Sequence, residues 1–143
     1  MRPGALWCNP GMSWELIDHT GDIGVVARAS TLEGLCAECA RAMFEILAEP
    51  APPAPAGMER FEVPGADPAE ELRDFLSELL YRFSADRKIY VVFMPGQGSI
   101  EAAWEPYDDA RHPLRTELKA VTYHQLDVAR EGEGWRGQVI FDV

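Results

Sequence analysis

The chain has 143 residues, which fits a single domain, and 47% of them are hydrophobic, enough for a sizeable core. Its formal net charge is −11 at pH 7. Phosphate backbones repel such a chain, so direct binding to nucleic acid is disfavoured, whereas metal cations or a basic protein partner suit it. Acidity that serves solubility alone is the alternative interpretation.

The cellular compartment can be predicted from what the sequence contains. Cys8, Cys36 and Cys39 are too few for a disulfide framework, which indicates a reducing compartment. No apolar run approaches the roughly 20 residues of a membrane span, and the first residues lack the apolar centre of a signal peptide. We therefore expect a cytoplasmic protein that does not enter a membrane.

The first residues differ in character from the rest of the chain. Residues 1–11 show no hydrophobic periodicity and contain Pro-Gly breakers at both ends. We interpret residues 1–12 as a disordered extension, or as the product of an early start codon, since Met12 also resembles a start. Residues 13–143 are then the single folded domain.

The next part of the chain predicts two strands and a helix. Residues 14–19 alternate, and residues 23–29 are rich in β-branched side chains, with a Thr-Gly-Asp turn between them. Ser30 and Glu33 have the spacing of a capping box, which predicts a helix start at Ser30. The helix extends to about Ala48, because apolar side chains recur along one of its faces.

The remaining chain predicts one more helix among strands. Asp67 and Pro68 start this helix, as N-cap and first helical residue, and an apolar stripe continues to Phe83. Strands are expected at 60–63, 89–94, 100–104, 117–130 and 135–143, the last two joined by a hairpin turn. This order indicates the α+β class: two helices packed on a mostly antiparallel sheet, in a single-domain two-layer sandwich.

Cys36 and Cys39 form a C-x-x-C pair, which is found at redox centres and zinc sites. Both cysteines fall on the apolar face inside the first helix, where burial raises a thiol pKa and opposes reactivity. Zinc needs four ligands, and the chain has no second pair. We therefore expect buried, structural thiols.

Oxygen ligands occur at two distant places in the sequence. Asp18, His19 and Asp22 flank the turn between the first two strands, where they could bind a metal or form an ordinary Asx turn. Asp142 precedes the terminal carboxylate of Val143, which would give two adjacent anionic donors. Such donors suit Ca²⁺, Mg²⁺ or Mn²⁺ better than zinc, while a frayed, solvated end is the alternative.

The segment 115–124 is the densest polar stretch in a predicted strand, with Glu117 and Lys119 on one face. These two residues could be surface charges or could position an anion. The chain contains no serine with a plausible base and no phosphate-binding loop. We therefore assign no catalytic residue and no organic cofactor site.

Four segments together resemble the archease family. They are WELIDHTGDIGV (14–25), ELRDFLSELLY (71–81), RTELKAVTYH (115–124) and VIFDV (139–143). The resemblance extends from about Ser13 to Val143. It departs from the family pattern in the extension at residues 1–11 and in Gly21, where many members have alanine.

The resemblance implies a function as a protein cofactor. Archeases activate an RtcB-type RNA ligase in tRNA splicing and RNA repair: they promote its guanylylation and its multiple turnover, and they are not enzymes themselves. The resemblance also implies a divalent metal ion, Ca²⁺ with Mg²⁺ or Mn²⁺ as alternatives, held by Asp22, Asp142 and Val143. His19 and Lys119 match motif positions, but no role is assigned to them.

Two other functions remain open from the residues alone. A metal-dependent phosphoester hydrolase could use Asp22 and Asp142 as ligands and His19 as base, although a cation for the phosphate would have to come from Lys119 or Arg115. A chaperone-like binding module is the other alternative, and an exposed apolar patch of several hundred Å² would favour it.

Overall fold

The computed structural model describes residues 12–19 and 21–143, except for the side chains of Asp18 and His19. The expected extension at the N-terminus, and with it Cys8, therefore lies outside the described residues apart from Met12. Neither helix in the described part of the chain is both long enough and apolar enough to cross a lipid bilayer.

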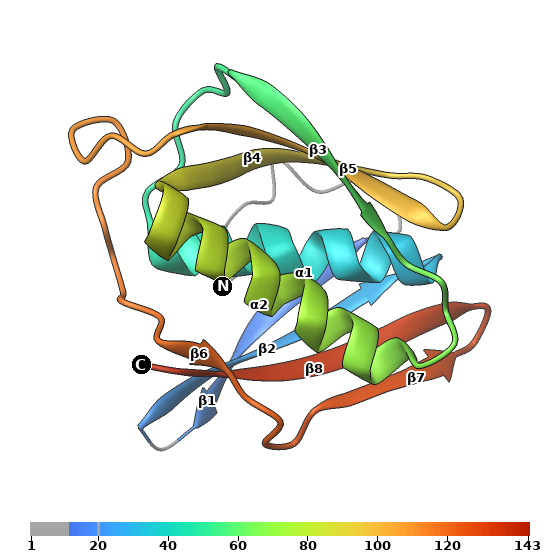
Figure 1. Cartoon of the computed structure of the whole chain (residues 1–143). Coiled ribbons are helices and arrows are strands. Elements are labelled where there is room, and N and C mark those ends of the chain that lie inside the picture. The colour runs from blue at the N-terminus through green and yellow to red at the C-terminus, as the bar shows by residue number, and fades with distance from the viewer. Residues whose placement is uncertain (1–11, 20) are drawn as a thin grey trace.

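The order of elements is ββαβαβββββ (Figure 1). The two helices are α1 (Leu32–Leu47) and α2 (Pro68–Asp86). The strands are β1 (Ser13–His19), β2 (Asp22–Ala29), β3 (Gly57–Glu62), β4 (Lys88–Pro95), β5 (Ser99–Pro106), β6 (Ala120–Val121), β7 (Asp127–Glu131) and β8 (Gly134–Asp142).

The α+β class, with two helices and antiparallel strands, is confirmed, but the strands form two sheets. One has the order β1-β2-β8-β6 with β7 also on β8, and the other has the order β3-β5-β4. Helix α1 lies between the two sheets, and α2 lies beside it (Figure 1). Of the 16 residues of α1, 14 are buried. A helix covered on nearly all sides needs a second apolar surface, which the smaller sheet provides.

The predicted strand over residues 117–130 is wrong. Two short strands, β6 and β7, pair with different parts of β8, and a turn separates them. Gln125 in this turn adopts a left-handed backbone with φ 51°. Few non-glycine residues take that conformation, and it cannot continue a strand. The hairpin between β7 and β8 is confirmed, with Gly132 at φ 60° in its two-residue loop.

The helix starts show one correction and one confirmation. Thr31 caps α1, because its hydroxyl accepts the N–H of Gly34 at 2.9 Å, so the expected cap at Ser30 is wrong by one residue. The carboxylate of Glu33 accepts the N–H of Gly98 at 2.6 Å, so it binds the loop between β4 and β5 of the smaller sheet. For α2, the cap at Asp67 and the proline at the helix start are confirmed.

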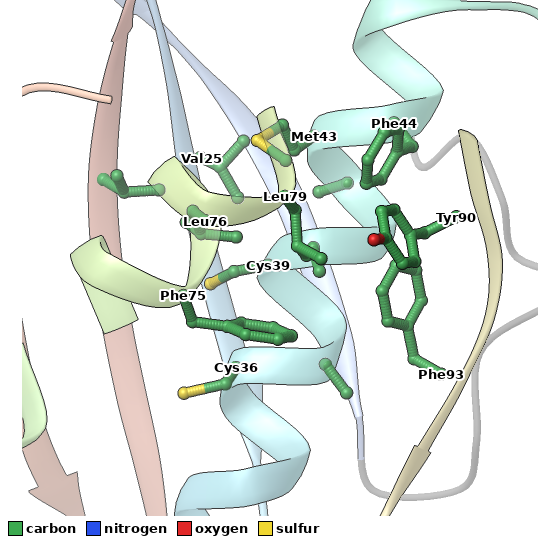
Figure 2. Packing of buried hydrophobic residues seen from close by; sticks show 14 of the residues in the cluster. Val25, Cys36, Cys39, Met43, Phe44, Phe75, Leu76, Leu79, Tyr90 and Phe93 are labelled. Carbon is green, nitrogen blue, oxygen red and sulfur yellow. The ribbon is translucent and has the colours of Figure 1, made fainter. Parts of the chain in front are cut away.

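The core encloses both cysteines of the described chain. Figure 2 shows Cys36 and Cys39 on α1, close to the side chains of α2. Both are fully buried and neither forms a disulfide. Burial raises the pKa of Cys36 to about 12 and that of Cys39 well above its usual value. The prediction of buried thiols is confirmed.

Candidate metal centre

The two aspartates predicted as metal ligands meet at one end of the larger sheet. Strands β2 and β8 are antiparallel, and Asp22 stands directly opposite Asp142 in their register. Side chains of directly opposed residues lie on the same face of a sheet, with Cβ atoms about 5 Å apart. Two carboxylates that are 120 positions apart in sequence are therefore neighbours. Asp22 is partly exposed and Asp142 is exposed.

Hydrogen bonds to backbone carbonyls hold the C-terminal end of β8 along the edge opposite β2. The Lys119 N–H donates to the carbonyl of Asp142 at 2.8 Å. The N–H and hydroxyl of Thr122 donate to the carbonyl of Ile140 at 3.0 Å and 2.9 Å. Figure 1 shows the C-terminus beside β6 and the β1–β2 hairpin. The end of β8 is thus paired on both edges, which argues against the frayed terminus considered from the sequence.

A glycine in β2 allows side chains to pack closely at the end of the larger sheet where Asp22 and Asp142 lie. A Cβ atom on Gly24 would lie 2.4 Å from Ile17 Cγ1 and 2.8 Å from Ile140 Cδ1, distances that such atoms do not adopt. The two isoleucines therefore close over Gly24, two positions from Asp22. The sequence showed Gly24 only as part of the 14–25 segment and gave no sign of this close packing. The hairpin turn itself contains Gly21 at φ 76°, a conformation that favours glycine.

The donor set fits a hard divalent cation in chemistry but is incomplete in number. Asp22, Asp142 and Val143, the three residues expected as ligands, offer oxygen atoms, the ligands that Ca²⁺ and Mg²⁺ prefer. Within the described residues, no three His, Cys, Asp or Glu side chains lie close enough together to hold a metal ion. Since Ca²⁺ takes six to eight ligands, water or a partner would have to complete the coordination of an ion bound here.

The two motif residues without an assigned role lie on either side of this pair. His19 is the register partner of Asp22 on β1, although its side chain lies outside the described atoms. Lys119 lines a cleft of about 370 Å³ against α2, together with Arg73 and Ser77. Arg73 donates from Nε to the carbonyl of Val121 at 3.2 Å. This bond connects α2 to β6, the strand that pairs with β8 at Asp142.

A second polar cluster, which was not predicted from the sequence, lies at the smaller sheet, β3-β5-β4. Glu105 is buried, and it accepts hydrogen bonds from Arg111, His112 and the N–H of Ala54 at 2.6, 2.8 and 2.8 Å. Burial by itself raises the pKa of Glu105, but these hydrogen bonds outweigh it and lower the pKa. The cluster joins two loops, and the only sequence signal for it was a polar stretch near residues 105–113.

Comparison with known proteins assigns the family. A model of the Archease protein family matches residues 14–143. Protein archease of Methanopyrus kandleri is 35% identical over 92% of this chain and all of its own length, and that of Methanosarcina acetivorans is 33% identical over 93% and 97%.

Two solved structures share the fold. The solution structure of a Methanobacterium thermoautotrophicum protein is 26% identical, with a TM-score of 0.71 over 91% of this chain and 98% of its own. The crystal structure of a Thermotoga maritima protein, described as an archease and possible chaperone, is 20% identical, with a TM-score of 0.63 over 90% and 96%. On the family model and the sequence identities, this chain belongs to the archease family.

Proposed function

We propose that this chain is a metal-binding protein cofactor that activates an RtcB-type RNA ligase in tRNA splicing and RNA repair, and that it is not an enzyme. The observation that carries the proposal is the register of β2 and β8, which places Asp22 opposite Asp142 beside the chain terminus. Membership of the archease family supports it. The ligase would gain guanylylation and multiple turnover from the complex.

In this proposal the residues of the chain bind and orient a divalent ion, Ca²⁺ with Mg²⁺ or Mn²⁺ as alternatives. Asp22 and Asp142 hold it from two neighbouring strands, and Val143 adds its terminal carboxylate. The ion would supply positive charge beside these carboxylates. Because the chain offers few ligands, water or groups of the ligase or its nucleotide would have to supply the others.

The overall charge favours a protein partner over RNA. A net charge of −11 repels phosphate backbones, so the proposal assigns RNA contact to the ligase and not to this chain. It also places the protein in the cytoplasm with that ligase. An acidic surface attracts a basic partner and speeds the encounter.

The test is RNA ligation under multiple-turnover conditions. A cognate ligase joins an RNA with a 2′,3′-cyclic phosphate end, with and without this protein, in the presence of Ca²⁺ or Mn²⁺. We expect stimulation by the wild-type chain, strongly reduced stimulation by Asp22→Asn and Asp142→Asn, and full stimulation by Asp109→Asn, which removes an exposed carboxylate from a distant loop. Equal product yield with and without the protein would refute the proposal.

The two alternative functions predict different results in the same preparation. A metal-dependent hydrolase would cleave a generic phosphodiester without any ligase, and this cleavage would depend on Asp22. A chaperone-like module would protect an unrelated unfolded protein from aggregation, regardless of the two aspartates. We expect neither activity.

A further inference from the structure

A groove of about 560 Å³ lies on the opposite side of α1 from the larger sheet. Its floor and walls come from the C-terminal half of α1, the loop that follows it, and strand β4. Phe44 and Pro50 contribute apolar surface, while Arg41, Glu45 and Glu49 contribute charge. No part of the proposed metal centre lines this groove.

The groove opens along the edge of a strand. Every residue from Ile89 to Pro95 lines it. Successive side chains of a strand point to opposite faces, so a cavity on one face would touch only alternate residues. A run of seven consecutive residues indicates that the groove follows the strand edge. Strand β4 pairs with β5 on one side, and no other described strand pairs with it.

An open strand edge presents backbone N–H and C=O groups that an added strand can satisfy. A bulge between Tyr90 and Val92 interrupts the register of β4 with β5, so the regular part of this edge begins at Val92. The lined run is about 23 Å long, at roughly 3.3 Å per residue. This elongated shape suits an extended peptide better than a compact small molecule.

The charge at the groove favours a cation. Glu45 is 8% exposed, and its Oε2 has no hydrogen-bond partner among the described residues. Burial raises the pKa of Glu45, Arg41 and Arg115 oppose this effect, and Glu38 adds to it. The guanidinium of Arg115 donates to the backbone carbonyl of Glu45 and leaves Oε2 without a donor. Arg41 forms an ion pair with Glu38, so its charge is largely compensated. The exposed carboxylate of Glu49 lies on the same rim. A buried carboxylate oxygen without a donor is costly, and a basic side chain would satisfy it.

We propose that this groove binds an extended segment of a partner protein, which adds to the edge of β4 from Val92 onward and places a lysine or arginine against Glu45. Apolar residues at alternate positions of the segment contact Phe44 and the apolar wall. This surface is separate from the metal centre and does not depend on the ligase proposal.

The first experiment measures peptide binding to the full chain by fluorescence anisotropy. The probes are labelled heptapeptides of alternating valine and threonine with a central lysine, alanine or glutamate. We expect the lysine peptide to bind about tenfold more tightly than the alanine peptide, the gain from one charge-assisted hydrogen bond, and the glutamate peptide to bind most weakly. Equal affinities, or no binding by any peptide, would refute the proposal, and neither outcome depends on a variant that has to fold.

Two further measurements locate the binding. Glu45→Gln should abolish the preference for lysine, whereas Glu133→Gln, in the exposed β7–β8 turn, should keep it. Hydrogen exchange with the lysine peptide should show new protection of β4 amides between Val92 and Met94. Protection elsewhere would contradict the assignment. Deletion of residues 1–11 should leave the affinity unchanged, and a large gain would show that this chain's own N-terminus, and not a partner, competes for the groove.

Discussion

Asp22 and Asp142 place two negative charges directly across a strand pair, an arrangement that destabilises a sheet. A cation bound between them would offset this repulsion, so we expect metal binding and stability to be coupled at these two residues. A ligand that binds only the folded chain stabilises it by about 2.7 kcal/mol at a hundred times its Kd. The pair is thus expected to respond to metal even in the absence of a partner.

The first prediction concerns this pair. Ca²⁺ and Mn²⁺ should each raise the melting temperature of the wild-type protein, and Asp22→Asn or Asp142→Asn should remove most of the rise, because each keeps the shape and removes an anionic ligand. Calorimetric titration gives the matching affinities, with Asp109→Asn as control. Unchanged binding in both variants would exclude these aspartates as ligands.

The second prediction concerns the thiols. Cys36 and Cys39 should resist alkylation in the folded protein, because they are fully buried and burial raises their pKa values. Both should react once the chain is unfolded. Mass spectrometry after a short pulse of iodoacetamide distinguishes the cysteines. Rapid labelling of either one in native protein would contradict a structural role.

At the scale of elements, helix α1 is the part that both sheets share. Its cap therefore affects more than local helicity, and the structure assigns that cap to Thr31 instead of Ser30. The two residues are adjacent hydroxyl residues at the end of β2, so each is a matched control for the other.

Thr31→Ala should lower the free energy of unfolding by about 1 kcal/mol, because the N–H of Gly34 loses its acceptor. Ser30→Ala should change it by less than about 0.5 kcal/mol, as for most exposed surface substitutions. Urea denaturation of both variants measures the difference. A larger loss for Ser30→Ala would restore the cap that the sequence suggested.

The Glu105 cluster joins the loop after α1 to the loop after β5. Its carboxylate has a lowered pKa, so it contributes stability that is present above the unfolded-state pKa of about 4.3 and is lost as pH falls through the lower folded-state pKa. Glu105→Gln should therefore destabilise the protein by about 1–3 kcal/mol at pH 7. The difference should shrink at acid pH, which thermal melts between pH 7 and pH 3 can follow. A constant difference would show that the charge is not what stabilises the cluster.

Local patterns predicted most elements, and long-range contacts decided what they missed. The apolar stripe of α2 and its Asp67–Pro68 start are encoded within a few residues, so they were predicted correctly. The division into two sheets depends on which strands cover α1, and no local window contains that information. The break in the 117–130 strand depends on the backbone of Gln125, a residue type that gives little warning of a left-handed conformation.

The candidate site divides in the same way. Asp22 and Asp142 could be named from the sequence as oxygen donors, but their meeting required the pairing of β2 with β8. Glu105 and Glu45 were not predicted, because a buried carboxylate is recognised by its surroundings and not by its neighbours in sequence.

At the scale of the whole molecule, the two proposed surfaces lie on different sides of α1. The proposed metal centre belongs to the larger sheet and the groove to the smaller one. One could therefore be blocked without altering the other, and a tag placed at one chain end provides a direct way to do so.

Residues added after Val143 should reduce ligase stimulation sharply, because they convert a terminal carboxylate into a neutral peptide carbonyl and crowd the metal centre. The fold should remain, since Val139 and Phe141 stay buried in the paired part of β8. A tag before residue 1 is the control and should be harmless. Equal stimulation of guanylylation by the two tagged forms would remove Val143 from the proposed ligands, while equal melting temperatures would show that both are folded.

The position of β8 also has a consequence for how the protein is made in the cell. This strand pairs with β2, β6 and β7, so the larger sheet is built around it. Translation delivers β8 on the order of a hundred residues after its partner β2. Until then β2 can pair only with β1, and α1 lacks much of the surface that it packs against. We therefore expect the nascent chain to stay incompletely folded on the ribosome, with apolar strands exposed to chaperones and proteases. It would fold late, through contacts between residues that are far apart in the sequence.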